Sequence, residues 1–241
     1  MVRFFVSSED VCDGVVRLGA ADCEHIRALR LRPSELFAVC NGEGTDYICR
    51  LSEHEGTTAV IVETRTSAGE PSINCIVYLA LSKGDRLEYA VQKSVELGAA
   101  GIVLFPSQRC VAVPSKISKK ITRLERIALE ASKQSGRGRV PAITDVESFE
   151  TAVIEAARAQ LPLFCYEDEN RRGLKEVLES QSVCGSVSVV TGPEGGFEPC
   201  EAQFAADAGM ISVSLGRRLL RCETAPIAVL AAVMCYAGEM R

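Results

Sequence analysis

LGRRLLRCETA at residues 215–225 and TGPEGGFEPCE at residues 191–201 are the two stretches that decide the fold of this 241-residue chain. Each follows a short apolar run typical of a buried strand, residues 211–213 in the first case and 187–190 in the second. A strand that stops at glycines and a proline leaves its backbone open to close approach by another group. Because α/β proteins bind ligands in loops at the carboxyl ends of strands, we expect these two loops to form a binding site.

The composition indicates a globular protein with an ordinary core. Hydrophobic residues make up 47% of the chain, which fits one large domain or two smaller ones. The net charge is −5 and tryptophan is absent. These features argue against unselective nucleic-acid binding, which needs a positive field over much of the surface, but they are compatible with a local basic face.

The cysteines indicate a reducing compartment. There are 11 of them, an odd number without a CxxC pair, and several lie inside apolar runs. This pattern favours buried free thiols over a disulfide framework. The only histidines are His25 and His54, for which a core or surface position is the better interpretation, so we expect no metal site. No apolar run is long enough to span a membrane and the first residues lack a signal peptide, so we expect a cytoplasmic protein.

The first 66 residues are expected to form a small β-rich unit such as a barrel. Asn41-Gly42 predicts a hairpin turn, because this pair accepts positive φ. One helix is expected at residues 21–30, with Ile26 and Leu29 facing inward. Residues 67–71 are interpreted as a linker. The predicted strands are residues 4–6, 36–40, 47–51 and 57–63.

The rest of the chain alternates between strands and helices. The continuous apolar run at residues 73–81 predicts a strand buried on both faces. Residues 85–97 follow as a helix, with Leu87, Val91 and Val95 on one stripe and Gly98 at its end. The further strands are expected at residues 101–105, 161–166, 187–190 and 211–213, and the further helices at 116–135, 171–180, 199–208 and 224–237, where Thr224 could cap the last one. This alternation predicts an α/β fold with a mostly parallel sheet flanked by helices.

Each candidate loop also has an interpretation without function. GPEGG fits neither the GxGxxG nor the GxxxxGK[ST] pattern and could be a tight strand-to-helix turn, although Glu194 is an acid set between glycines. The 215–225 loop could be an ordinary basic surface loop, or its backbone and leucines could enclose a flat heterocycle while its arginines meet phosphate. Cys222 has no histidine near it in sequence, so a small packing residue is favoured over a nucleophile.

Basic residues outside these loops could form the local basic face that the net charge hides. Arg137 follows a helix in a glycine-rich stretch, from which we expect it to reach outward. It would be joined by Lys133, Arg139 and the basic run at residues 116–126. For Lys93 and Glu96, a solvated helix face is at least as good an interpretation.

Taken in order, the motifs resemble those of the RsmE family. KGDRLEYAVQKSVELG, SQR at residues 107–109, EASKQSGR, GPEGGF and LGRRLLRCETA have the order and spacing of that family, across essentially the whole chain. Its members are 16S ribosomal RNA uridine-N3 methyltransferases of the SPOUT class. The resemblance implies a PUA-like β-barrel RNA-binding domain at residues 1–68 and a SPOUT methyltransferase domain with a C-terminal trefoil knot at 72–241. It also implies a homodimer with the active site at its interface, and 16S rRNA or the small ribosomal subunit as partner.

The resemblance implies S-adenosylmethionine as cofactor, bound by three loops. The implied cofactor-binding residues are Tyr166, Thr191, Gly192, Pro193, Glu194, Gly195, Gly196, Leu215, Gly216, Leu219, Leu220, Thr224 and Ala225. The implied RNA-binding residues are Arg3, Arg30, Lys83, Arg86, Arg109, Arg137 and Arg218. The chain departs from the family at Glu198 and Cys222, where small hydroxyl residues are usual, and at Pro33-Ser34, where a glycine is usual.

Residue type and loop position suggest roles in methyl transfer. Arg221 or Arg137 would stabilise the uridine anion as it develops. Glu194 or Glu223 would take the N3 proton if burial raises its pKa. The alternatives are a related SPOUT enzyme that methylates another base or a ribose, and a non-catalytic RNA-binding protein with the same fold.

Overall fold

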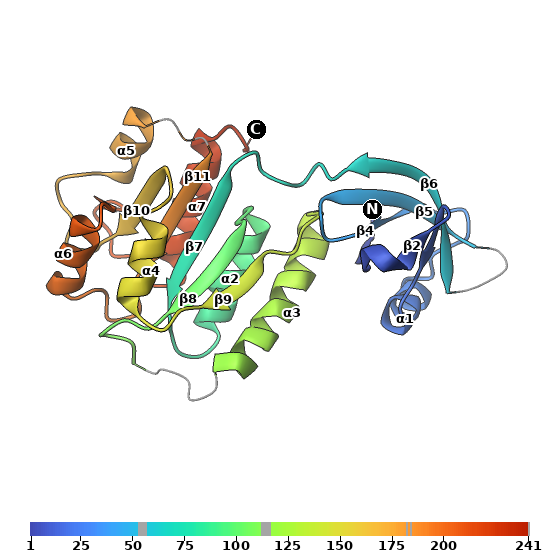
Figure 1. The fold of residues 1–241 in the computed structure, drawn as a ribbon, viewed down its shortest axis with the longest axis horizontal. Coiled ribbons are helices and arrows are strands. Elements are labelled where there is room, and N and C mark those ends of the chain that lie inside the picture. The colour runs from blue at the N-terminus through green and yellow to red at the C-terminus, as the bar shows by residue number, and fades with distance from the viewer. Residues whose placement is uncertain (53–56, 112–116, 182, 184, 241) are drawn as a thin grey trace. The chain divides into compact units, whose positions relative to one another are not determined.

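Figure 1 shows the computed structural model of the chain, which describes residues 1–52, 57–111, 117–181, 183 and 185–240. His54 and Lys116 lie outside the described residues. The residues group into two compact units. The first contains Met1–Glu70 together with Ser132–Val140, and the second contains Pro71–Ala131 together with Pro141–Arg241.

The first unit is built on a six-stranded sheet of order β1-β4-β5-β6-β3-β2. β1 runs parallel to β4, and the other neighbours are antiparallel. The predicted hairpin is confirmed between β4 and β5, where Asn41 Oδ1 accepts from the N–H groups of Glu43 and Thr45 and Gly42 has a φ of +77°. The strands are β1 (Arg3–Phe5), β2 (Val11–Cys12), β3 (Val15–Arg17), β4 (Phe37–Cys40), β5 (Thr45–Leu51) and β6 (Thr58–Thr66), with a 3-10 turn η1 at Ser8–Asp10.

Helix α1 (Ala20–Leu29) covers the apolar core of this sheet. Ile26 is buried in the same core cluster as Phe4 and Phe37, as the helical spacing predicts, and Cys23 is buried there as well. The prediction that Leu29 faces inward is wrong, because its side chain is 44% exposed. The helix ends there, since the next residue turns into the left-handed region, and the apolar stripe ends with it.

A buried ion pair joins the first strand of this unit to the hairpin. Arg3 donates to both oxygens of Asp46, at 2.7 and 2.9 Å, and the two side chains are only 10% and 1% exposed. Cys40 and Ser67 also donate to Asp46. Burial alone would raise the pKa of Asp46, but hydrogen bonds from Arg3, Ser67 and Cys40 outweigh it and lower the pKa. The Arg3 guanidinium is therefore committed to the interior of the unit.

A second carboxylate fastens residues 132–140 into the same unit. Glu70 Oε1 accepts from the backbone N–H groups of Gly138 and Arg139, each at 3.0 Å. Its Oε2 accepts from the Arg137 guanidinium at 2.8 Å. Arg137 is only 3% exposed. The expectation that Arg137 reaches outward is therefore wrong, because a partner far away in sequence holds it inside.

The second unit confirms the predicted parallel sheet flanked by helices. Its six strands run parallel in the order β12-β10-β11-β7-β8-β9. The strands are β7 (Asn74–Ala80), β8 (Gly101–Phe105), β9 (Ala142–Asp145), β10 (Leu161–Cys165), β11 (Ser186–Thr191) and β12 (Ile211–Val213). The helices are α2 (Arg86–Glu96), α3 (Ile117–Ser135), α4 (Phe149–Ala156), α5 (Leu174–Ser180), α6 (Pro199–Asp207) and α7 (Thr224–Tyr236).

Strand β9 and helix α4 have no counterpart in the sequence prediction. β9 is an edge strand of four residues, of which only Ile143 is buried, so it lacks an apolar run. α4 is eight residues long and its cap, Ser148, accepts from the Thr151 N–H. Phe149 of α4 packs among Phe105, Phe164 and Phe197, so tertiary contacts stabilise a helix with a weak local signal.

Helices cover both faces of this sheet, as both views show. Ser188 and Val190 of β11 face α4, since Ser188 Oγ donates to the Ala156 carbonyl and Val190 belongs to the same core cluster as Phe149. Val187 and Val189 point the other way because side chains alternate along a strand. α7 contacts β11 and also packs against α2 and α5.

The strand order changes direction between β7 and β11. From β7 the chain moves outward through β8 to β9, whereas β11 leads to α6 and β12 on the other side. The loops that follow two neighbouring strands therefore diverge at this point. Open α/β sheets leave a crevice at such a point, outside the carboxyl ends of the strands.

The last helix, α7, starts differently from the prediction. Its N-cap is Glu223 rather than Thr224, and no side chain caps it. Pro226 lies in the first turn, where the missing N–H leaves no hydrogen bond unmade.

Among the described residues no helix has both the length and the apolar character needed to cross a membrane.

We predict that Asp46→Asn destabilises the first unit by about 3–5 kcal/mol, because it leaves the buried Arg3 guanidinium without its counter-charge. Urea unfolding of the full chain at pH 7, followed by circular dichroism, measures this loss. Lys175→Gln, which removes an exposed pair with Glu179, is the control and should cost under about 1 kcal/mol.

The contribution of Asp46 to the stability of the first unit depends on pH. Because the folded pKa of Asp46 is lowered, its contribution is present above the unfolded value of about 3.9 and is lost as pH falls through the folded pKa. The advantage of the wild type over Asp46→Asn should therefore shrink below about pH 4. An equal cost for Asp46→Asn and Lys175→Gln would contradict the account.

Candidate active site

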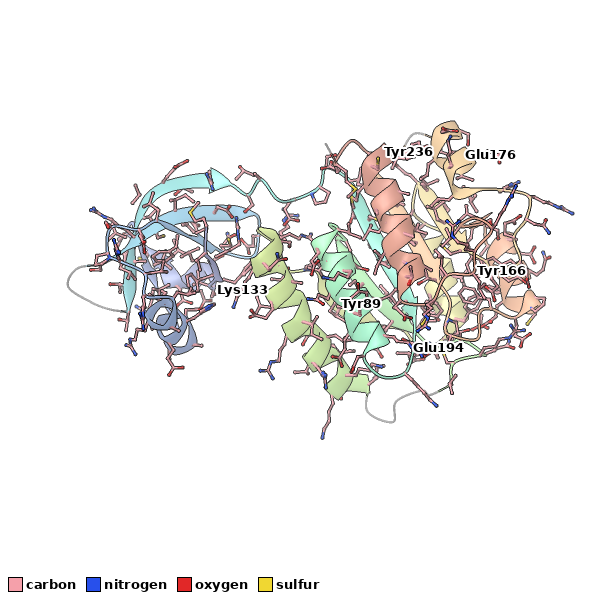
Figure 2. All side chains as sticks on the ribbon, turned by 180° about the vertical axis from the view of Figure 1, so that it is seen from behind. Tyr89, Lys133, Tyr166, Glu176, Glu194 and Tyr236 are labelled. Atoms are coloured by element: carbon pink, nitrogen blue, oxygen red, sulfur yellow. The ribbon has the colours of Figure 1, made fainter. Side chains whose placement is uncertain are left out.

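A cavity of about 700 Å³ lies beyond the carboxyl ends of β10, β11 and β12. Three loops form most of its wall, and Arg86, the first residue of α2, and Arg109, from the loop after β8, complete it. Figure 2 shows Glu194 in the lower part of this unit and Tyr166 at about half its height, both below Glu176 and Tyr236. The cavity is lined by Arg86, Arg109, residues 165–168, residues 192–196, residues 214–223 and Ala225.

The glycine loop, residues 192–197, is held first through Glu194. Oε1 of Glu194 accepts from the Lys83 N–H and from Arg86 Nη1, each at 2.9 Å. Burial alone would raise the pKa of Glu194, but the hydrogen bonds from Lys83 and Arg86 and from its own backbone N–H outweigh it and lower the pKa. The loop after β7 therefore fixes the loop after β11 at the point where the strand order changes direction.

Arg109 holds the same loop from the β8 side. It donates to the Gly195 carbonyl at 3.0 Å and to both oxygens of Glu198 at 2.7 and 3.0 Å. A Cβ on Gly195 would meet the Arg109 Cβ at 3.0 Å and its carbonyl oxygen at 3.3 Å. The contact between the two loops thus depends on a missing side chain as well as on hydrogen bonds.

The third contact comes from the loop after β10. Glu167 Oε1 accepts from the Phe197 N–H at 2.9 Å. A Cβ on Gly196 would overlap the Glu167 carboxylate, and Gly196 has a φ of +69°, which side-chain-bearing residues rarely adopt. Glu167, which is not among the predicted cofactor-binding residues, is therefore a defining contact of the site.

The arginine-rich turn, residues 215–223, forms another part of the wall. Arg217, Arg218 and Arg221 are exposed, and Leu219 is 84% exposed. The turn closes onto α7 through the Arg221 carbonyl, which accepts from the N–H groups of Thr224 and Ala225. This wall therefore presents both positive charge and apolar surface to the cavity.

Cys222, on the same turn, is not activated as a nucleophile. Burial raises the pKa of its thiol to about 12, and the Glu223 and Glu194 carboxylates act in the same direction. Because the thiolate is the reactive form, the thiol of Cys222 is inert at neutral pH.

The structure confirms that the glycine loop and the arginine-rich turn share one cavity, since Gly195 and Leu220 both line it. Of the predicted cofactor-binding residues, Thr191 and Thr224 do not line it. Thr191 is buried, and its hydroxyl donates to the Tyr78 carbonyl between two strands. The residues that do line it are Tyr166, Gly192, Pro193, Glu194, Gly195, Gly196, Leu215, Gly216, Leu219, Leu220 and Ala225.

Two predicted roles need correction. The pKa of Glu194 is lowered, not raised, so its carboxylate is a weak proton acceptor. Arg137 is buried in the first unit with Glu70 and lines no part of the cavity. Arg221 and Glu223 both line the cavity. In the described part of the chain, no group of three His, Cys, Asp or Glu side chains is arranged to hold a metal ion.

Comparison with known proteins places this chain in a family. The RNA methyltransferase domain family matches residues 69–234. A ribosomal RNA small subunit methyltransferase E from Synechocystis is 31% identical over 96% of this chain and 76% of its own length. The chain is a member of the ribosomal RNA small subunit methyltransferase E family.

Other members of the family agree along most of the chain. The Bacillus subtilis protein of the same name is 29% identical over 86% of this chain and 84% of its own length. A crystal structure of the Neisseria gonorrhoeae family member bound to S-adenosyl methionine has a TM-score of 0.84 and 30% identity, covering 98% of this chain and 97% of that one.

We predict that Gly196→Ala lowers stability more than Gly238→Ala does. Both glycines have positive φ, +69° and +78°, so each alanine should cost about 1 kcal/mol in backbone strain. Only at Gly196 does the added Cβ displace Glu167 and break its bond to the Phe197 N–H. Thermal unfolding of the two variants measures the difference. Equal shifts would show that Glu167 does not constrain the loop.

Proposed function

We propose that this chain transfers a methyl group from S-adenosylmethionine to N3 of a uridine in the 16S ribosomal RNA of the small subunit, in the cytoplasm. The observation that supports this best is the shared cavity of the glycine loop and the arginine-rich turn. Membership of the family and a similar structure described as bound to S-adenosyl methionine supply the cofactor and the reaction class.

The residues of the cavity fit such a cofactor. A volume of about 700 Å³ suits a nucleoside-sized ligand. Oε2 of Glu194 is buried, and none of the described residues donates a hydrogen bond to it. A hydroxyl or amino group of the ligand would satisfy this oxygen. Gly195 and Gly196 leave room for Arg109 and Glu167, which hold the loop that would contact the ligand.

Bound S-adenosylmethionine supplies an activated methyl group, so the protein has to align the base and remove its N3 proton. Glu223, on the cavity wall, is the proposed proton acceptor. It replaces Glu194, whose lowered pKa makes its carboxylate a weak base. Arg221 lies two residues away and is exposed, so its guanidinium can stabilise the charge that develops on the uridine ring.

The finer architecture is proposed on the same grounds. We propose that residues 72–241 form a SPOUT domain with a C-terminal trefoil knot and that residues 1–68 form a PUA-like β-barrel that binds RNA. The Arg172 carbonyl accepts from the Ser214 N–H, and the Leu174 N–H donates to the Ser214 carbonyl. These bonds hold the segment after β10 beside the segment after β12, which are two of the segments that would form the knot. Arg30, Lys83 and Arg218 are exposed and are the proposed RNA contacts, and a homodimer would complete the site.

Nucleoside analysis tests the proposed function. The purified chain is incubated with labelled S-adenosylmethionine and either naked 16S rRNA or small subunits, and the RNA is digested and separated by chromatography. We expect label in 3-methyluridine. Label on another base or a ribose would show a related methyltransferase instead, and RNA binding without label would show a non-catalytic protein.

We predict that Arg221→Ala lowers kcat about a hundredfold, since a group that stabilises the developing anion contributes on this scale. Arg218→Ala, on the same turn, should leave kcat unchanged, weaken RNA binding and reduce its salt dependence by the equivalent of one phosphate contact. Single-turnover kinetics at saturating RNA separate the two effects. An unchanged kcat for Arg221→Ala removes Arg221 from the chemistry.

A further inference from the structure

Glu201 is a buried carboxylate that the proposed chemistry does not use. It is the third residue of α6 and is only 3% exposed. Its Oε1 accepts from Ser107 Oγ at 2.9 Å and from the Gln108 N–H at 3.0 Å. Its Oε2 accepts from the Glu198 N–H at 2.8 Å. A buried carboxylate with three donors is fully satisfied, and removing one oxygen leaves at least one donor without a partner.

These donors lie on the two segments that carry the Arg109 contact. Ser107 and Gln108 immediately precede Arg109 on the loop after β8, and Glu198 is the N-cap of α6, directly after the glycine loop. Glu201 therefore holds the loop that carries Arg109 close to the start of α6, where Arg109 contacts Glu198. The Glu198 carboxylate accepts from the Arg109 guanidinium through both oxygens.

Arg109 transmits this constraint to the cavity wall. Its guanidinium donates hydrogen bonds to both the Gly195 carbonyl and the Glu198 carboxylate, and its backbone packs against Gly195. A planar guanidinium can make these bonds at once, whereas a lysine ammonium cannot reproduce the fork. A displacement of the Ser107–Arg109 segment would therefore move Gly195 directly.

We propose that Glu201 and Arg109 are positioning residues that hold the glycine loop in its cofactor-binding form, so that Arg109 serves S-adenosylmethionine binding rather than RNA binding. This inference rests on the proposed function, because it takes S-adenosylmethionine as the ligand of that loop. It differs from the role that the family resemblance implies for Arg109, which is a contact with RNA.

The test measures S-adenosylmethionine and RNA binding separately on the full-length protein. Isothermal titration with S-adenosylmethionine gives the first affinity. Fluorescence anisotropy with a 16S rRNA transcript at several salt concentrations gives the second. The variants are Glu201→Gln, which keeps the side-chain volume, and Arg109→Lys, which keeps the positive charge.

Glu176→Gln is the matched control. Glu176 is also the third residue of its helix, α5, so Glu176→Gln makes the same change of charge at the same helix position as Glu201→Gln. It is exposed, and Figure 2 shows it well separated from Glu194. Any effect of removing a negative charge near a helix N-terminus appears in this control as well.

We expect Glu201→Gln and Arg109→Lys each to weaken S-adenosylmethionine binding about tenfold and to raise its KM similarly. The kcat at saturating cofactor and the affinity for RNA should stay within about twofold, and Glu176→Gln should match the wild type. A general loss of folded protein would lower kcat without raising KM. A raised KM at nearly unchanged kcat therefore distinguishes a positioning role from a loss of folded protein. The effects of the two variants should not add in the double variant, because the residues act on one contact.

Two results would overturn the inference. One is unchanged S-adenosylmethionine binding by folded Arg109→Lys or Glu201→Gln. The other is an Arg109→Ala variant that weakens RNA binding and lowers its salt slope while leaving cofactor affinity intact, which is the behaviour of a phosphate contact. If Glu201→Gln fails to fold, Ser107→Ala, which removes one of the three donors, and Arg109→Lys decide the question. If the wild type itself binds no S-adenosylmethionine, the proposed function fails first, and the inference fails with it.

Discussion

The hydrogen bonds from Lys83 and Arg86 to Glu194 are the constraint on which the rest of the site depends. They join the loops of β7 and β11, the two neighbouring strands at which the sheet reverses its order of connection. Loops that diverge here leave a crevice, but they are free to move apart unless a contact crosses between them. A glutamate in a glycine-rich turn provides that contact, and the same bonds keep its carboxylate ionised at neutral pH.

The charged side chains of the site fall into two groups, those that hold the glycine loop and those that line the cavity on the arginine-rich turn. Glu194, Glu198 and Glu201 are occupied by backbone N–H groups, a serine hydroxyl and guanidinium groups. Glu223 and Arg221 line the cavity on the arginine-rich turn, where Glu223 Oε2 accepts from the Cys222 thiol at 3.3 Å. These glutamates thus have different roles because their hydrogen-bond partners differ. Such partners also shift the pKa of a carboxylate.

Much of the second unit could be predicted from sequence, because its signals are local. The run ending at Ala80 and the stripe of Leu87, Val91 and Val95 carry their own periodicity, and the glycine loop is recognisable by its lack of side chains. Contacts distant in sequence could not be predicted in this way. Arg137 is buried because Glu70 lies beside it, and the pKa of Glu194 is lowered by a loop more than a hundred residues earlier. The edge strand β9 and the short helix α4 depend on tertiary packing for the same reason.

The central claim is that the glycine loop and the arginine-rich turn enclose one ligand. A crystal structure of the protein with S-adenosylmethionine tests this most directly. The account predicts the ligand against the backbone of residues 192–196 on one side and residues 215–220 on the other, with a ligand donor within hydrogen-bond distance of Glu194 Oε2. A ligand bound outside this cavity, or one that contacts only one of the two loops, would contradict it.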